Sequence, residues 1–546
     1  MFSKLTTYWH TLKYLRPAQV WGRMVNLAKR GARKEFAEAP EVRKVPVAIP
    51  QLDLDKTVNE RFGLDELCGS KLKLLNQTVQ IAYDAAHMVW LKPLIQFNLQ
   101  YFEYAVALAA EYKRTGDKRY ADLFGKYYRS YLSAGNHVHH AYVIALHIPN
   151  VLIALELFGD AVDGDLRKRI YAELYTQYRH LERRLERHLM ANHYFEDLKA
   201  LVIASHVFGE DAKCRKYLRM FRKECQEEIL PDGMHFELSP MYHKIIWEDL
   251  LRVYSVLGGN GNSDLTWLRK DIIKMAEAGA FLEQGICRTP LFSDGGDNVA
   301  KPFASLLQST ERLTGAKIKA PDSLPDAGYY RLQDGPVTAL IDCGRVGVDY
   351  NPAHGHNDCL SFELFVDGKP LFVNQGTYEY QGERRMMFKR TAAHNTVTIN
   401  GHEQNEMWSG FRVGRRILDV RATKHTPTEF SGQYRNMFGE THQRTITLRD
   451  NTLTVLDTTP DAPAGTTVVS YLHLAPGYIY KDGQIYRKAD NCPVANIQTI
   501  NVKIDYVTEG DLTLYAQEFG RLEQASCLRF TWRADSQPHG YRLTLN

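Results

Sequence analysis

The stretch KAPDSLPDAG, residues 319–328, divides the sequence into two halves of different character. Proline, aspartate and glycine at this density are typical of a linker. Before the linker, long segments carry apolar residues at helical spacing, and after it short segments with β-strand character alternate with turns. The sequence therefore predicts an α-helical domain followed by a β domain, with a cleft between them as the expected place for a functional site.

The first half predicts helices that are joined by short polar connections, without strands between them. The expected helical segments are 93–114, 148–159, 197–209, 243–259 and 264–285. All but the first end in glycine, which often caps a helix at its carboxyl end. This pattern fits antiparallel helix pairs, arranged as a bundle or as a closed ring. No apolar run approaches the roughly 20 residues that a membrane-spanning helix needs.

The second half predicts an all-β sandwich of many short strands. The expected strands are 337–344, 360–368, 370–374, 395–401, 451–459, 467–474, 501–507 and 511–516. Asp367-Gly368 is a hairpin turn signal, although Lys369-Pro370 predicts a longer loop. The predicted organisation is thus a helical arm at 1–60, a helical domain at 61–320 and a β-sandwich at 325–546.

Composition excludes some functions and locations. The chain of 546 residues has 68 Lys and Arg against 64 Asp and Glu, which is too balanced for an obligate nucleic-acid binder. A local basic cleft is still compatible with an acidic substrate. The eight cysteines form no CxxC pair and predict buried free thiols. The first residues lack the apolar region of a signal peptide, so a cytoplasmic location is expected, with the periplasm as the alternative.

Four segments contain reactive polar side chains in parts of the chain that are expected to be well ordered. They are MANHYFEDLKAL (190–201), LPDGMHFELSPMYHKIIWEDLL (230–251), NPAHGHNDCLSFEL (351–364) and NQGTYEY (374–380) with RRMMFKRTAAHNTVTING (384–401). Singly, most have an ordinary structural explanation: Asn192 as a helix N-cap beside a solvated Glu196, and Tyr242 with His243 as a core tyrosine and a surface histidine.

Three histidines of the second half form a candidate metal site. If His354 and His356 lie on a strand, a period of two puts both rings and Asp358 on one face. This spacing is common among metal ligands, but two ligands leave the metal interpretation open. His394 follows a basic run that ends at Arg390, and it either closes a solvated loop or converges with the other two histidines.

Taken together, these side chains fit β-elimination from an acidic sugar. An asparagine or a protonated histidine near the sugar carboxylate stabilises the charge that develops when the neighbouring proton leaves. A tyrosine can supply or take a proton if nearby cations lower its pKa. The sequence has no glycine-rich phosphate loop and no GxSxG motif, so nucleotide and esterase chemistry are unsupported.

Five ordered motifs resemble those of the heparinase II/III-like polysaccharide lyases, a group that includes related alginate lyases. They are ANHYFEDLKAL, DGMHFELSPMYH, HGHND, VNQGTYEY and RTAAHNTVTING, with FNLQYFEY (97–104) and PLFSDGGD (290–297) in support. The resemblance covers most of the chain. It implies an N-terminal incomplete α/α toroid followed by a C-terminal antiparallel β-sandwich.

The resemblance also implies roles for single residues. Asn192 and His193 would lie at the substrate carboxylate, Tyr242 would be the catalytic acid and a candidate base, and His354 would complete the group from the β domain. The residues expected to bind substrate are Glu196, His243, Tyr142 and Arg390.

The family's structural zinc would map to His356, Asn374 and His394. The middle ligand of that site is typically aspartate, and an amide oxygen is a poorer zinc ligand than a carboxylate. The alternative is that these three side chains share hydrogen bonds. No organic cofactor is expected.

Two other functions stay open at this stage. One is a glycoside hydrolase on the helical toroid, with Glu237 and Asp249 as candidate carboxyl groups. The other is a non-catalytic protein for carbohydrate binding or exopolysaccharide assembly. In the leading interpretation the partner is an acidic polysaccharide or oligosaccharide, and a homodimer is the expected oligomer.

Overall fold

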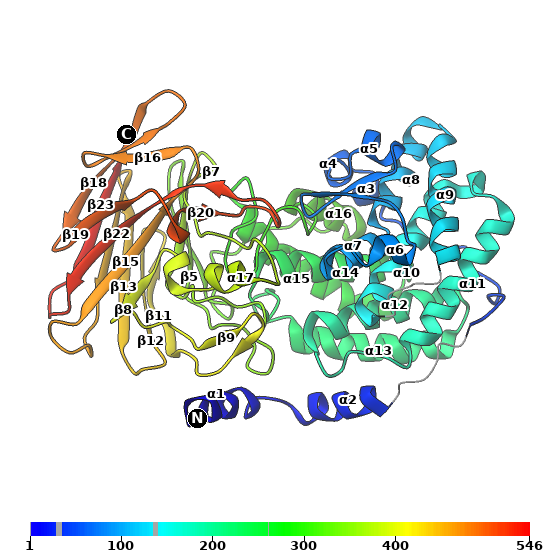
Figure 1. The fold of residues 1–546 in the computed structure, drawn as a ribbon, viewed down its shortest axis with the longest axis horizontal. Coiled ribbons are helices and arrows are strands. Elements are labelled where there is room, and N and C mark those ends of the chain that lie inside the picture. Colours follow the sequence, from blue (N-terminus) through cyan, green and yellow to red (C-terminus); the bar gives the residue numbers. More distant parts are fainter. Residues whose placement is uncertain (1, 29–34, 135–139, 260) are drawn as a thin grey trace.

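The computed structural model describes residues 2–28, 35–134, 140–259 and 261–546. A helical part and a β part lie side by side, and the chain passes from the first to the second after residue 314 (Figure 1). The helical part before the linker and the β part after it confirm the order of fold classes that the sequence predicts.

The helical part is built from antiparallel neighbours along the chain. Its central helix α10 (Ala141–Phe158) contacts α8 and α12, and α12 in turn contacts α14. The other helices are α3 (Pro50–Asp53), α4 (Lys56–Asn59), α5 (Leu64–Cys68), α6 (Ala85–Met88), α7 (Pro93–Tyr101), α8 (Glu103–Thr115), α9 (Arg119–Ala134), α11 (Gly164–Leu181), α12 (Ala191–Val207), α13 (Asp211–Glu228), α14 (Pro240–Val256), α15 (Thr266–Glu283) and α16 (Phe303–Thr314).

Three expectations for the helical part need correction. The segment 93–114 is two helices, because Phe102 between α7 and α8 adopts a left-handed conformation with φ of 57°. A hairpin of β1 (Lys71–Leu74) and β2 (Gln77–Gln80) interrupts the helices, so strands are not absent from this half.

The third correction concerns α10. The segment Ala141–Ala161 is long and apolar enough to cross a membrane, although His147, Pro149 and Asn150 break its apolar run. In the structure, 78% of its most apolar window is buried inside the protein. Its hydrophobicity is therefore explained by its place at the centre of the helical core.

The β part contains two large antiparallel sheets. The first has the order β11-β12-β13-β14-β23-β18-β17-β16 and the second β19-β22-β15-β7-β6-β5-β4-β3, with β8 paired to β15. A cluster of buried apolar side chains contributed by both sheets forms the core of this part.

The strand bounds show where the sequence prediction was incomplete. Several strands, such as β11 and β12, are half exposed and were not predicted. The strands are β3 (Ser323–Leu324), β4 (Tyr329–Asp334), β5 (Val337–Asp342), β6 (Phe362–Val366), β7 (Lys369–Phe372), β8 (Val397–Ile399), β9 (Met407–Ser409), β10 (Arg412–Val413), β11 (Leu418–Thr426), β12 (Glu429–Arg435), β13 (Thr441–Arg449), β14 (Thr452–Thr458), β15 (Thr467–Leu474), β16 (Tyr478–Lys481), β17 (Gln484–Arg487), β18 (Cys492–Ile500), β19 (Lys503–Val507), β20 (Leu514–Tyr515), β21 (Glu523–Gln524), β22 (Ser526–Arg533) and β23 (His539–Leu545).

Two local predictions in the β part and one about the cysteines were wrong in detail. Lys369 pairs with Val366, so Asp367-Gly368 alone forms the turn between β6 and β7 and no longer loop is needed. The segment that holds His354 and His356 is a loop, because β6 begins only at Phe362. All eight cysteines are free, and Cys68, Cys287 and Cys492 are exposed rather than buried as expected.

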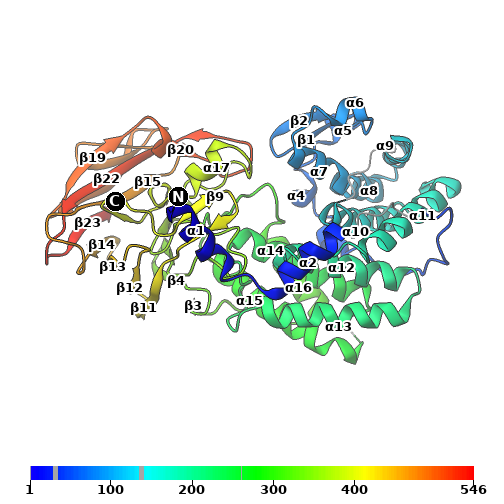
Figure 2. The same ribbon diagram turned by 60° about the horizontal axis from the view of Figure 1, so that its bottom comes forward.

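An arm of two helices, α1 (Phe2–Leu12) and α2 (Pro17–Ala28), runs across both parts. Figures 1 and 2 show α1 beside the β part and α2 beside the helical part. Thr7 donates a hydrogen bond to Glu406 of the β part over 2.7 Å. Arg16 forms an ion pair with Glu227 at the end of α13. The arm therefore contacts both parts of the molecule.

Candidate active site

A cavity of about 600 Å³ lies between the helical part and the β part. Helices α7, α10, α12 and α14 supply one wall, and the loop around His354 with Tyr380 and Phe411 supplies the other. Of the residues predicted for the site, six line this cavity together: Tyr142, Asn192, His193, Glu196, Tyr242 and His354.

Tyr242 meets His354 across the boundary between the two parts. Ser239 caps α14 by accepting a hydrogen bond from the backbone N–H of Tyr242, which fixes the tyrosine in the first turn. The rings of Tyr242 and His354 have centroids 3.9 Å apart, and the hydroxyl groups of Tyr242 and Tyr380 are 2.8 Å apart. Burial, followed by the influence of Tyr380 and Asp294, raises the pKa of Tyr242 well above 10, so it is a neutral phenol.

Asp294 holds His354 in place. One of its carboxylate oxygens lies 2.8 Å from Nδ1 of His354, and the other lies 2.9 Å from Nε2 of His356. The guanidinium of Arg385 pairs with both oxygens. Burial alone would raise the pKa of Asp294, but Arg385 and the histidines hold it well below its ordinary value.

The contact with Asp294 determines which nitrogen of His354 can react. An ionised carboxylate only accepts hydrogen bonds, so Nδ1 of His354 carries the proton and Nε2 is left with a lone pair. Burial lowers the pKa of His354, although its bond to Asp294 acts in the opposite direction. His354 is therefore a neutral base at neutral pH.

Asn192 and His193 lie in the first turn of α12, directly after two residues with strained backbone conformations. Met190 and Ala191, both without the freedom of glycine, have φ of 61° and 49°. Such conformations are costly and cluster at functional sites. Oδ1 of the buried Asn192 has no hydrogen-bond partner, and Nδ1 of His193 lies 3.0 Å from Oε2 of Glu186. The turn thus presents an amide and an oriented imidazole at the cavity.

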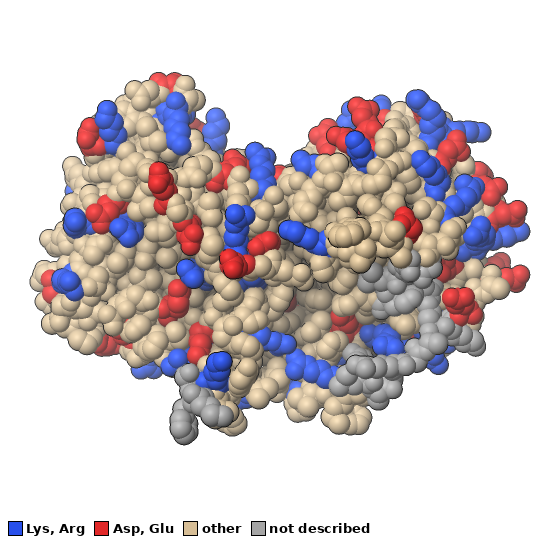
Figure 3. Space-filling model, viewed as in Figure 1, with Lys and Arg blue, Asp and Glu red and all other residues tan. Residues whose placement is uncertain are grey.

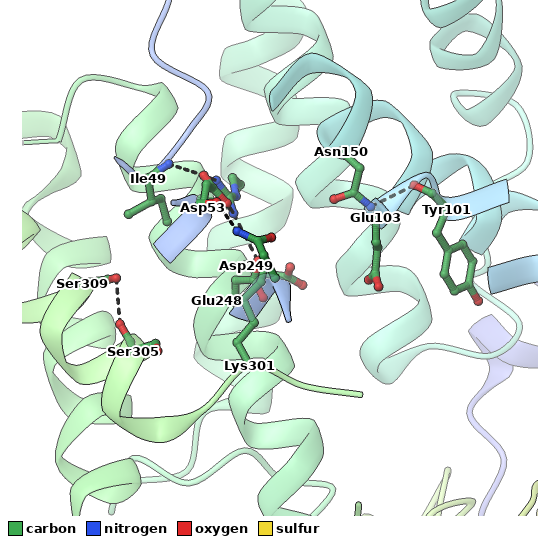
Figure 4. A network of polar contacts seen from close by, with 12 residues as sticks. Ile49, Asp53, Tyr101, Glu103, Asn150, Glu248, Asp249, Lys301, Ser305 and Ser309 are labelled. Atoms are coloured by element: carbon green, nitrogen blue, oxygen red, sulfur yellow. Dashed lines mark hydrogen bonds and ion pairs between the residues drawn. The ribbon is translucent and has the colours of Figure 1, made fainter. Parts of the chain in front are cut away.

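A chain of buried charges forms the helical wall of the cavity. Lys199 pairs with Glu196 and, over 2.7 Å, with Asp249. Burial and the nearby Glu196 raise the pKa of Asp249 well above its ordinary value. Figure 4 shows the neighbouring pair of Glu248 and Lys301, close to Asp249. Glu196, Asp249 and Glu248 thus form ion pairs with Lys199 and Lys301. The helical wall therefore carries charges of both signs and is not basic.

The carboxyl pair considered for hydrolysis is not presented to the cavity. Asp249 lines the cavity, but Glu237 does not. Both oxygens of Glu237 are buried without a partner, and Oε1 lies 4.0 Å from Nε2 of His354. Burial, with a smaller effect of Asp294, raises the pKa of Glu237 to about 8. No observation on this pair favours hydrolysis.

His243 and Arg390 do not line the cavity. His243 is buried, with Nε2 3.0 Å from the carbonyl of Met275 and Nδ1 accepting from the backbone of His235, so it is a core residue. Arg390 is exposed, whereas its neighbour Arg385 points inward. The expectation that His243 and Arg390 bind substrate therefore lacks support from the geometry.

Three residues of the site were missed by sequence reasoning. Asp294, Tyr380 and Arg385 lie in segments that were quoted for the family or for their charge, but no role was given to them. Asp294 lies 60 positions from His354 and 91 from Arg385, so only the fold reveals their contact.

The expected zinc ligands lie close together, but they do not form a complete zinc site. The rings of His356 and His394 are 5.3 Å apart, and Nδ1 of His356 and Nε2 of His394 are buried without partners. Oδ1 of Asn374 already accepts hydrogen bonds from Ser361 over 2.6 Å and from His394 over 3.1 Å. The third ligand is thus neutral and already bonded, so the set does not fit a zinc ion. Among the described residues, no group of three or more His, Cys, Asp or Glu is placed to hold a metal.

Comparison with known proteins agrees with this arrangement. The family model "Heparinase II/III N-terminus" matches residues 76–310, and "Heparinase II/III-like, C-terminal" matches residues 317–538. A solved structure of heparinase III has a TM-score of 0.66 and 14% identity, over 96% of this chain and 89% of that one. At this identity the likeness shows the fold, an incomplete α/α toroid followed by an antiparallel β-sandwich.

Curated relatives match over shorter stretches. A heparin-sulfate lyase of Pedobacter heparinus is 23% identical over 34% of this chain and 31% of its own length. The FtsZ-localized protein C of Caulobacter vibrioides is 25% identical over 50% of this chain and 47% of its own length. These matches span less than half of the relatives. With both family models covering most of its length, the chain belongs to the heparinase II/III-like family.

Proposed function

We propose that this protein is a polysaccharide lyase that cleaves a uronate-containing polysaccharide by β-elimination. The observation that supports this most directly is the contact of Tyr242 with His354 inside a cavity that Asn192 and His193 also line. An acid, a base and donors for a carboxylate are the groups that this reaction needs. They come from both parts of the molecule, so an extended chain bound between the parts would meet them together.

The protonation states suggest how the roles are divided. His354, neutral and held by Asp294, takes the proton next to the sugar carboxylate through Nε2. Tyr242, a neutral phenol, donates its proton to the departing glycosidic oxygen. The amide of Asn192 and the imidazole of His193 bind the carboxylate while negative charge builds up on it.

A substrate screen tests the proposal. The purified protein is incubated with heparan-like, hyaluronan-like, alginate-like and bacterial capsular polysaccharides, and ultraviolet absorbance and reducing ends are followed together. Elimination raises both signals in equal amounts, because each cleavage forms one unsaturated uronate. New reducing ends without absorbance would show hydrolysis and contradict the proposal.

We further propose that the His356–Asn374–His394 cluster is held by hydrogen bonds rather than by zinc. The amide oxygen of Asn374 accepts hydrogen bonds from Ser361 and His394, which supports this proposal. We expect elemental analysis to find no stoichiometric zinc in the purified protein and a chelator to leave its melting temperature unchanged. Asn374→Asp, which supplies a carboxylate, should increase zinc binding. One tightly held zinc per chain in the unaltered protein would contradict this proposal.

A further inference from the structure

The helical arm of residues 2–28 presents an apolar surface to solvent. On α1, Leu5, Trp9 and Leu12 follow helical spacing and are 61%, 65% and 57% exposed, and Tyr8 lies beside them. On α2, Trp21 is 67% exposed, and Val20 and Met24 share its face. Half of the large apolar side chains that are most exposed in the described structure therefore lie on this arm.

The opposite face of the arm is fixed to the protein, so the apolar face is held outward. Thr11 accepts a hydrogen bond from Trp408 over 3.0 Å, and Gln19 donates one to the carbonyl of Tyr350 over 3.2 Å. The backbone at Gly22 lies so close to His188 that a Cβ would meet its nitrogen at 2.9 Å. The exposed tryptophans consequently belong to a docked element with a defined orientation.

The charge of this segment indicates what covers its apolar face. Residues 2–28 contain four Lys and Arg and no Asp or Glu. Of these, Lys4 on α1 and Lys13 directly after α1 are exposed, and Arg23 on α2 is partly exposed. Lys and Arg side chains also gather along the lower edge of the molecule in Figure 3, where α1 and α2 lie in Figure 1.

We propose that α1 and α2 form a docking face for the surface of an anionic lipid bilayer. Helices that lie in a membrane interface combine Trp and Leu on one face with Lys and Arg around it, and the cations bind anionic headgroups. A second copy of the chain is a less suitable partner, because two arms of residues 2–28 in contact would bring eight cations together and neither arm contains an Asp or Glu.

Docking would also orient the cavity. Helix α1 contacts β10, whose residue Arg412 lines the cavity together with Phe411. A molecule docked through the arm therefore has one edge of its cavity close to the lipid surface. This inference does not depend on the reaction proposed above.

Vesicle sedimentation with the full chain tests the proposal. Vesicles of phosphatidylcholine alone are compared with vesicles that also contain phosphatidylglycerol. We expect binding to the anionic vesicles that weakens in high salt, and at least tenfold weaker binding to the neutral ones. The double variants Trp9→Ser/Trp21→Ser and Lys4→Glu/Lys13→Glu should each reduce anionic binding about tenfold or more.

Trp90→Ser is the matched control, because Trp90 is 86% exposed but lies outside the arm. It should bind vesicles like the unaltered protein, and the melting temperatures of all variants should agree because only exposed side chains change. The proposal is overturned if the unaltered protein does not bind anionic vesicles. It is also overturned if Trp9→Ser/Trp21→Ser leaves vesicle binding intact but dissociates an oligomer seen by light scattering, which would identify a second copy as the partner.

Discussion

Tyr242 combines two features at the residue scale: it is buried enough to stay protonated, and it touches the base on the other side of the cavity. Tyr242→Phe removes the proton donor but keeps the ring that packs on His354. Because one positioned proton transfer contributes about 10²–10⁴ in rate, we expect turnover to fall by that factor while substrate binding changes little. Initial rates by absorbance and binding by calorimetry measure the two effects. A variant with more than a tenth of the original turnover would exclude Tyr242 as the acid.

Glu237 makes stability depend on pH. Its pKa is about 8 in the folded protein, against 4.5 as the ordinary value. Between these values the unfolded chain releases the proton while the folded protein keeps it, so stability falls as pH rises, by at most about 1.4 kcal/mol per pH unit. Glu237→Gln has no such proton. We therefore expect the variant to gain stability relative to the unaltered protein from pH 5 to pH 8 in urea unfolding.

The exposed Glu509 provides the control for this prediction. Glu509→Gln should keep the pH dependence of the unaltered protein. If the difference between Glu237→Gln and the unaltered protein is the same at pH 5 and pH 8, Glu237 is not protonated in the folded state.

The resemblance to the family predicted that Asn192, His193, Tyr242 and His354 belong to one site, and all four line the same cavity. Their catalytic roles stay predictions. Arg385 could not be distinguished from Arg390, since both belong to one basic run. The direction of each depends on α17 (Glu383–Phe388) and on Asp294, far away in the sequence.

At the scale of elements, the hairpin of β6 and β7 shows how two residues determine a register. Asp367 and Gly368 have φ of 49° and 72°, as a two-residue turn between strands requires. The sequence prediction failed only on the loop length, because Lys369 was left between the expected strands 360–368 and 370–374. Lys369 instead pairs with Val366, and Pro370 pairs with Phe365 next to a register shift.

This hairpin provides a stability prediction. A Cβ on Gly368 would meet no atom closer than 3.8 Å, so Gly368→Ala adds backbone strain without a clash. We expect a loss of about 1 kcal/mol in the free energy of unfolding by urea. Gly164→Ala is the matched control: Gly164 begins α11, has open space around it and no positive φ, and alanine there should stabilise slightly. If both substitutions change the free energy of unfolding equally, the positive φ of Gly368 in the turn is not what makes Gly368→Ala destabilising.

At the scale of the whole molecule, the boundary near residues 319–328 could be predicted because composition changes there. The cleft between the two parts was also expected, but the contacts that Asp294 makes across it were not, because they join residues far apart in the chain. Asp294 lies between α15 and α16 of the helical part, yet its partners are His354, His356 and Arg385 of the β part. One carboxylate thus links the two parts and also orients the base.

Asp294→Asn tests this double role. It keeps the size of the side chain but leaves Arg385 buried beside a neutral amide, and breaking a buried ion pair costs about 3–5 kcal/mol. Since the pKa of Asp294 is depressed, its contribution is complete above about pH 4, the ordinary value for aspartate, and is lost as pH falls further. The stability difference between variant and unaltered protein should therefore be constant near neutral pH and shrink in acid.

Asp457→Asn separates the catalytic from the structural effect. Asp457 is also buried and pairs with a histidine and an arginine, His442 and Arg444, but wholly within the β part. We expect both variants to unfold at lower urea concentration. Only Asp294→Asn should also reduce turnover and change the acid limb of the pH–rate profile, because only Asp294 holds the base that faces the cavity. Equal losses of turnover in the two variants would mean that stability alone, and not the orientation of His354, explains the effect.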